Sequence, residues 1–242
     1  MNTNSLILLG CSFTVSLCSG LPSFAAPITI TSASNVTLDF NGFYDSSNIN
    51  IPGLSGMVNL SNFVFTNTTV GSLPATIVSM NYTIINDSSA PVLTSRISNF
   101  AFDTTPTLLN TALNQVTGVF NTVAVDANQP NGIGTVEVCF TAVNCPGGGG
   151  GGVSLGNSGG GTASIYFGGN IAAFTLDNAF LRYQSVTCSA GAPCNASASG
   201  GLAGGDRVPE PSRDQVPEPS TYVLMTLGLA GLAFASRYTR RA

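Results

Sequence analysis

The chain has 242 residues, of which 43% are hydrophobic and only 7% are charged, and its formal net charge is −4. It contains no lysine and no histidine, so it lacks the basic clusters with which proteins hold nucleic-acid phosphates. The same absence excludes serine and cysteine triads, Ser-Lys dyads and Schiff-base chemistry. The hydrophobic share is too high for a disordered chain, and the length suits one domain with its own core.

The N-terminal segment has the features of a secretory signal peptide. Apolar residues run from 6 to 9 and from 13 to 17, and the small residues Ser23 and Ala25 precede the expected cut. We therefore expect residues 1–25 to be removed after export through the Sec machinery. The sequence around Cys11 also resembles a lipoprotein box, but too few apolar residues precede it to favour lipidation.

Between Ile28 and Ser185 the chain is typical of short strands separated by turns. Apolar residues alternate with polar ones in 36–40 and in 78–84, which places one set on a buried face. Further strands are expected at 56–66, 92–102, 119–126, 134–141, 162–167 and 171–185. Helical spacing occurs only in 107–115. This pattern predicts an all-β fold, an antiparallel β-sandwich or jelly-roll-like single domain over residues 26–189.

One glycine-rich segment interrupts this domain, and a second segment of small residues follows it. Residues 146–161 include six consecutive glycines and are predicted to form a surface loop, because glycine loses much conformational entropy on folding. A phosphate-binding loop would need a lysine and a following helix, which this segment lacks. Residues 190–215 are rich in Gly, Ala, Ser and Pro and are predicted to be a linker.

The C-terminus combines three features in a fixed order. An extended segment, Val216, Pro217, Glu218, Pro219, Ser220 and Thr221, precedes an apolar run at 222–236. Arg237, Arg240 and Arg241 then close the chain and favour the cytoplasmic side of a membrane. The run is short for a durable transmembrane helix, so it suits a temporary tether.

This tail, residues 216–242, resembles the PEP-CTERM family of exported proteins. The resemblance implies recognition of Val216 to Thr221 by the membrane enzyme exosortase, and loss of the helix and the arginines on maturation. It also implies a Gram-negative bacterium that makes exopolysaccharide. An upstream copy of the motif surrounds Glu210. We expect the copy at Glu218 to be the working one, because only it adjoins the apolar run.

Four cysteines remain after removal of the signal peptide, namely Cys139, Cys145, Cys188 and Cys194. In an oxidising compartment an even number of cysteines indicates disulfides. We favour the two local pairs, 139 with 145 and 188 with 194; the pairing of 139 with 188 and 145 with 194 is the next alternative. Zinc is disfavoured by the ligand spacing and the lack of histidine, so no metal site or cofactor is predicted.

A pair of carboxylates is the one catalytic arrangement that the composition leaves open, as in glycosidases. The candidates are Asp39, Asp45, Glu137 and Asp177. Without tryptophan to line sugar rings, we expect no enzyme. Convergence of Asp39, Asp45 and Asp177 on calcium is a second possibility, although no ligand-spaced loop supports it.

The sequence therefore predicts an exported, exosortase-processed structural protein of the cell surface or extracellular matrix, associated with exopolysaccharide or biofilm. The alternative is a carbohydrate-binding module of the β-sandwich type. Such a module would need exposed aromatic rings, for which Tyr44, Tyr166 and Tyr183 are the candidates.

Overall fold

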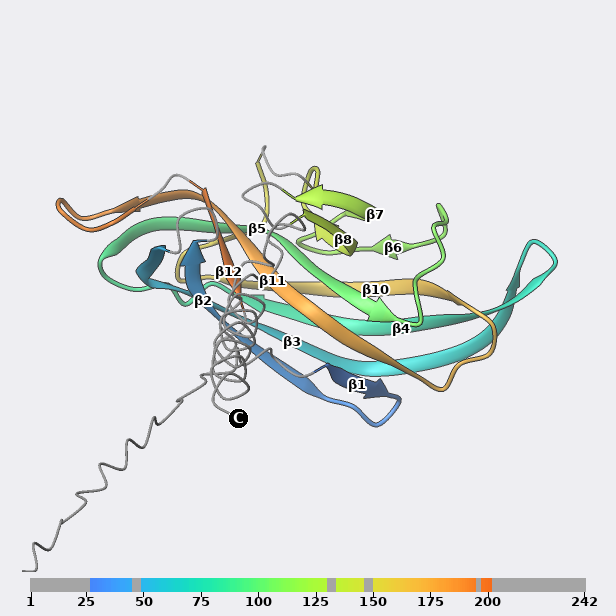
Figure 1. Ribbon diagram of the computed structural model, residues 1–242. Helices are drawn as coiled ribbons and strands as arrows, with labels where there is room; N and C mark the ends of the chain where they lie inside the picture. The colour runs from blue at the N-terminus through green and yellow to red at the C-terminus, as the bar shows by residue number, and fades with distance from the viewer. Residues whose placement is uncertain (1–26, 45–48, 130–133, 146–149, 195–196, 202–242) are drawn as a thin grey trace, which may run out of the picture.

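The computed structural model describes residues 27–44, 49–129, 134–145, 150–194 and 197–201. Within these ranges every regular element is a strand and all paired strands run antiparallel (Figure 1). The strands are β1 (Ile28–Thr31), β2 (Val36–Tyr44), β3 (Ile49–Val70), β4 (Leu73–Ile85), β5 (Val92–Thr105), β6 (Gln115–Val116), β7 (Thr122–Gln129), β8 (Gly134–Thr141), β9 (Val153–Ser154), β10 (Ser158–Gly168), β11 (Ala173–Cys188) and β12 (Ser197–Gly201).

The strands form two sheets. Sheet A has the order β1-β11-β5-β8-β7, with β12 paired to β11 and β9 paired to β5. Sheet B has the order β2-β3-β4-β10-β6. The all-β, antiparallel prediction is confirmed, and two sheets around one core fit the expected sandwich.

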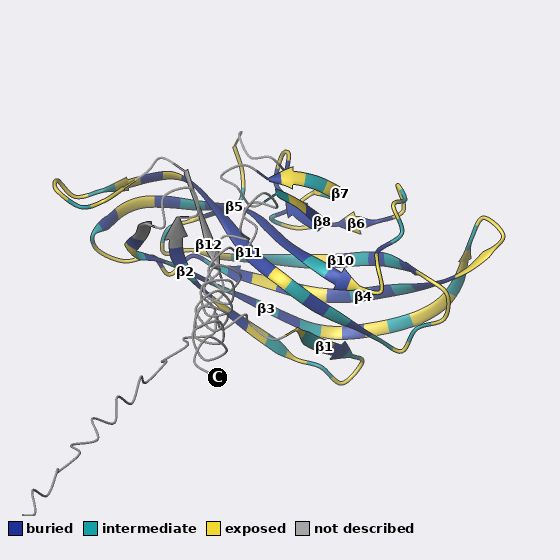
Figure 2. Cartoon of the chain, viewed as in Figure 1, coloured by how far each residue is buried: buried dark blue, intermediate teal, exposed yellow. Residues whose placement is uncertain are grey.

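The core lies between the sheets because apolar residues alternate along the strands. On β4, Val78, Met80, Tyr82 and Ile84 are buried, whereas the residues between them are half-buried or exposed. Figure 2 shows the same alternation along the strands of sheet B. Because successive side chains of a strand point to opposite faces, one set of alternating residues lies inward and the other outward. The burial therefore follows directly from the sequence pattern.

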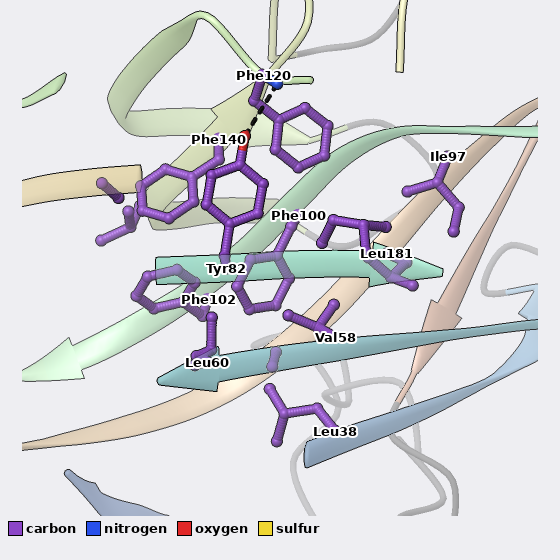
Figure 3. Packing of buried hydrophobic residues seen from close by; sticks show 14 of the residues in the cluster. Leu38, Val58, Leu60, Tyr82, Ile97, Phe100, Phe102, Phe120, Phe140 and Leu181 are labelled. Atoms are coloured by element: carbon purple, nitrogen blue, oxygen red, sulfur yellow. Dashed lines mark hydrogen bonds between the residues drawn. The ribbon is translucent and has the colours of Figure 1, made fainter. Parts of the chain in front are cut away.

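Aromatic rings from both sheets fill the centre of this core (Figure 3). Tyr82 on β4 stacks on Phe120, with ring centroids 5.7 Å apart. Phe102 on β5 and Phe140 on β8 meet edge to face at 5.5 Å. Offset and edge-to-face contacts add about 1 kcal/mol each to the burial of the rings.

The loop predicted at 146–161 is shorter in the structure. Residues 146–149 lie outside the described residues, but β9 and the first residues of β10 fall within the predicted loop. The segment at Thr117 and Val119, which follows β6, continues beside β10, and its amides donate to the carbonyls of Thr162 and Gly160. A side chain at Gly161 would collide with the carbonyl of Thr117. Gly161 therefore stands where two backbone segments approach each other closely, and not in a free loop.

Two other segments also differ from expectation. The linker predicted at 190–215 contains β12, which pairs with residues 180–184 of β11 and also lies against β2 (Figure 1). The segment 107–115 forms no helix, because its backbone bonds to β10 instead: the Leu109 amide donates to the Tyr166 carbonyl at 2.7 Å. Pairing with a neighbouring strand has thus overridden the composition of the predicted linker and the helical spacing of 107–115.

Candidate functional site

The first disulfide joins Cys139, on β8, to Cys145 in the loop that follows, with their Cα atoms 6.1 Å apart. Both cysteines are buried, at 0% and 2% exposure. The Gln129 amide donates to the Cys145 sulfur at 2.8 Å, and the Asn99 amide donates to the Cys145 carbonyl at 2.6 Å. The bridge and these bonds hold the loop after β8 against sheet A.

This loop completes a second, small core on the outer side of sheet A. Its buried members are Ala101, Val136, Cys139, Cys145 and Phe180. As a result, β5 from Ile97 to Phe102 and β11 from Ala179 to Gln184 are buried on both faces. The middle of the outer face of sheet A is therefore covered.

The second disulfide joins Cys188, at the end of β11, to Cys194. Cys188 is half-buried and Cys194 is exposed. The bridge closes the turn from which the chain returns toward β11 as β12. Both local pairings favoured from the sequence are present in the structure.

Glu137 ties two strands together at the point where their pairing ends. The ladder between β5 and β8 stops at Phe102 and Val138. Beyond it, the Glu137 carboxylate accepts from the Thr104 amide and hydroxyl, both at 2.7 Å, and from the Leu108 amide. In return, Asp103 accepts from the Glu137 amide at 2.9 Å. The two carboxylates thus replace the missing ladder bonds, which is a structural task.

The remaining candidate carboxylates do not gather at one place. Asp39 is exposed on β2 of sheet B, whereas Asp177 lies on β11 of sheet A, opposite Asp103. Asp177 accepts from the amide of Asn178 at 2.7 Å, as turn and bulge aspartates commonly do. Asp45 lies outside the described residues. Among the described residues no three His, Cys, Asp or Glu side chains are placed to hold a metal ion.

The three candidate tyrosines differ in exposure. Tyr183 was a candidate for the exposed ring of a sugar-binding surface, and the structure excludes it: the residue is fully buried, and its hydroxyl ends against Gly56 of β3. Burial raises the pKa of Tyr183 well above its ordinary value, and the Asp87 carboxylate raises it further. Tyr166 is half-buried on β10, with Ile77 of β4 opposite it. The side chain of Tyr44 lies outside the described residues.

The outer side of sheet B is an open face on which most side chains are neutral and polar, and we call it the sheet B face. Its members alternate with core residues along four neighbouring strands and the segment after β6. Its polar members are Thr37, Asn59, Ser61, Thr66, Ser79, Asn81, Thr83, Thr117, Thr162 and Ser164. Met57, Val64 and Ile77 are apolar members of the same face, and Tyr166 lies beside Ile77 at one end. Asp39 is the one charged residue in the strands of sheet B. Sequence reasoning identified the polar alternation but did not single out this face, because only strand order brings the residues together.

The sorting segment, Val216 to Thr221, and the three arginines lie outside the described residues. So does the apolar run at 222–236; within the described ranges no helix is long and apolar enough to cross a membrane.

The tail has a match among known protein families. It has the order of a C-terminal sorting signal, and residues 215–241 match the PEP-CTERM protein-sorting motif. The predicted resemblance is confirmed for this segment. The motif is the recognition signal of exosortase, and it marks the chain as an exported protein whose membrane-anchored precursor is processed to the cell surface. No curated protein and no solved structure matches the chain.

Proposed function

We propose that the protein is a structural component of the cell surface or extracellular matrix, associated with exopolysaccharide and released from its membrane tether by exosortase. The observation that carries the proposal is the match of residues 215–241 to the sorting motif. A signal peptide at 1–25 and export through the Sec machinery complete the pathway.

The β domain acts in this proposal without catalysis. Of the carboxylates considered for an acid–base pair, Glu137 is engaged by three backbone or hydroxyl donors, and Asp39 and Asp177 lie in different sheets. A glycosidase pair needs two carboxyl groups on either side of one bond. The described carboxylates support a structural role better than a hydrolytic one.

The processing step is tested by the mass of the mature C-terminus. We expect the exported protein to end near Pro217 to Thr221, and Glu218→Ala to leave residues 222–242 attached. Glu210→Ala, in the upstream copy of the motif, is the matched control and should be processed normally. Recovery of the intact tail on most of the unaltered exported protein would refute the proposal.

A carbohydrate-binding module is the second candidate function. The observation that favours it is the open, nearly uncharged sheet B face with Tyr166 at one end.

A further inference from the structure

The charged residues on the strands are divided unequally between the two sheets. The strands of sheet A carry Arg96, Asp103, Asp126, Glu137, Asp177 and Arg182. The strands of sheet B carry Asp39 alone, at the edge strand β2. In addition, the middle of sheet A is covered on its outer side, whereas the sheet B face is open. One face of the domain is therefore both accessible and almost free of charge.

We propose that the sheet B face is a docking surface for an uncharged polysaccharide. This inference rests on the proposed extracellular, polysaccharide-associated function and names the surface and the chemical class of its partner. A charged polymer would require opposite charges on the protein. The strands of the face carry Asp39 alone, and Asp87 accepts from Ser55 at one end, so the face has no positive charge for an anionic polymer. The partner that it fits is a neutral chain rich in hydroxyl groups.

The hydrogen-bonding groups of the face suit such a partner. Hydroxyl groups both donate and accept, and side-chain amides carry both kinds of group, so they can exchange water for sugar hydroxyls. This exchange avoids the cost of removing a charge from water. Because neighbouring strands lie about 4.8 Å apart and like-facing residues about 7 Å apart, the groups form a regular grid on which a repeating polymer can make many equivalent contacts.

Several side chains of the grid are already held by their neighbours. Thr37 donates to Asn59 at 2.7 Å, and the hydroxyls of Ser79 and Ser164 lie 3.0 Å apart. The hydroxyls of Thr117 and Thr162 lie 2.9 Å apart. Restricting rotamers before binding reduces the conformational entropy lost on association, which favours docking of a stiff polymer.

Tyr166 gives the face one aromatic position. It projects from β10 on the same side as Ser164 and Thr162, beside Ile77 of β4. The hydroxyl rows and the ring together provide hydrogen bonds and an apolar patch for one sugar face. A polymer lying along β10 would meet both.

The test uses the processed protein purified from the cell exterior and its binding to dextran and cellulose, with alginate as an anionic comparison. Asn81→Lys and Asn81→Asp place opposite charges at the centre of the face, where Asn81 is exposed. Both should weaken binding to a neutral polymer by about tenfold, because either charge must be desolvated. Binding of the unaltered protein should change little with salt.

Thr135→Lys and Thr135→Glu are the matched controls, because Thr135 is exposed on β8 of sheet A. They should bind as the unaltered protein does. Stronger alginate binding by Asn81→Lys with weaker binding by Asn81→Asp would show an anionic partner and overturn the proposal. Three other results would also overturn it. They are no binding to either neutral polymer, an equal loss of binding in the Thr135 variants, and concentration-dependent self-association through this face instead. If neutral polymers fail to bind while the processed protein stays in the matrix, the docking surface is wrong and the proposed function stands.

Discussion

Two buried tyrosines, Tyr82 and Tyr183, differ in the hydrogen bonding of their hydroxyl groups. The Tyr82 hydroxyl accepts from the Phe120 amide at 3.1 Å (Figure 3). It also donates to the Thr117 carbonyl at 2.8 Å. The Tyr183 hydroxyl is buried and has no hydrogen-bond partner within the described part of the chain. An unsatisfied buried polar group costs about 1 to 3 kcal/mol, so the two hydroxyls contribute to stability with opposite sign.

Tyr183→Phe is therefore expected to raise the free energy of unfolding at neutral pH by about 1 kcal/mol. Tyr82→Phe, the matched control, should lower it by about 1 to 3 kcal/mol, since it leaves a carbonyl and an amide unpaired. Urea unfolding followed by fluorescence or circular dichroism measures both. Destabilisation by Tyr183→Phe as large as that by Tyr82→Phe would contradict this reading of the core.

The pKa of Tyr183 adds a pH dependence to the same prediction. Burial raises this pKa well above its ordinary value, so above about pH 10 the unfolded chain loses a proton that the folded chain keeps. Stability is therefore fully present below about pH 10 and falls as the pH rises further, by up to about 1.4 kcal/mol per pH unit from this group. Tyr183→Phe should make the alkaline decline shallower.

At the scale of the element, β10 illustrates how glycine can support a strand. Gly159, Gly160 and Gly161 begin a strand that pairs with β4 along its whole length. Because Gly159 and Gly161 have no side chains, the segment from Thr117 to Val119 can lie close beside the strand and donate to it. The strand therefore depends on its glycines at one end and on Ala163, Ile165 and Phe167 in the core at the other.

Gly161→Ala should destabilise the protein by about 1 to 3 kcal/mol, because the new methyl group collides with the Thr117 carbonyl and the backbone must move. Gly168→Ala, on the same strand, is the matched control: its nearest contact would be the Leu109 side chain at 3.6 Å. That substitution should be neutral or slightly stabilising, since it restricts the unfolded chain. Thermal unfolding distinguishes the two, and equal melting temperatures would contradict the role given to Gly161.

At the scale of the whole molecule, the two disulfides lie in different environments. The 139–145 bridge is buried in the second core of sheet A, whereas the 188–194 bridge is at the surface beside β12. Exchange with an external thiol requires access to a sulfur atom. The two bridges should therefore respond differently to a reductant although each closes a loop of similar size.

Under native conditions dithiothreitol and iodoacetamide should label Cys188 and Cys194 first, and Cys139 and Cys145 only when the second core opens. Loss of either bridge should lower the free energy of unfolding by about 2 kcal/mol, because the unfolded chain gains conformational entropy. Peptide mapping of timed samples gives the order of labelling. In denaturant the two pairs should react at similar rates, which is the control; similar rates in the native protein would show that the second core does not protect its bridge.

Local pattern was sufficient for much of this molecule. The period-two alternation at 78–84 correctly predicted a strand with an inward apolar face, because alternation itself determines which side chains share a face. Close spacing of the cysteines favoured the local pairs that the structure contains. The tail could be recognised because its motif, apolar run and arginines are consecutive, and the family match covers the same residues.

The tertiary structure decided what depends on residues far apart in the chain. Tyr183 looked like a candidate for the surface, but its side chain belongs to the core between the sheets and ends against Gly56 on sheet B. Glycines at 159–161 indicated a loop, but they belong to β10, where the Thr117 carbonyl lies too close to Gly161 for a side chain. Similarly, β12 formed within a predicted linker because β11 offered an open edge. Composition determined that the chain would carry few charges. Strand order alone placed nearly all the strand charges in one sheet and left the other sheet with a nearly neutral face. The reason is that neighbours across a sheet are set by strand pairing and not by distance in the sequence.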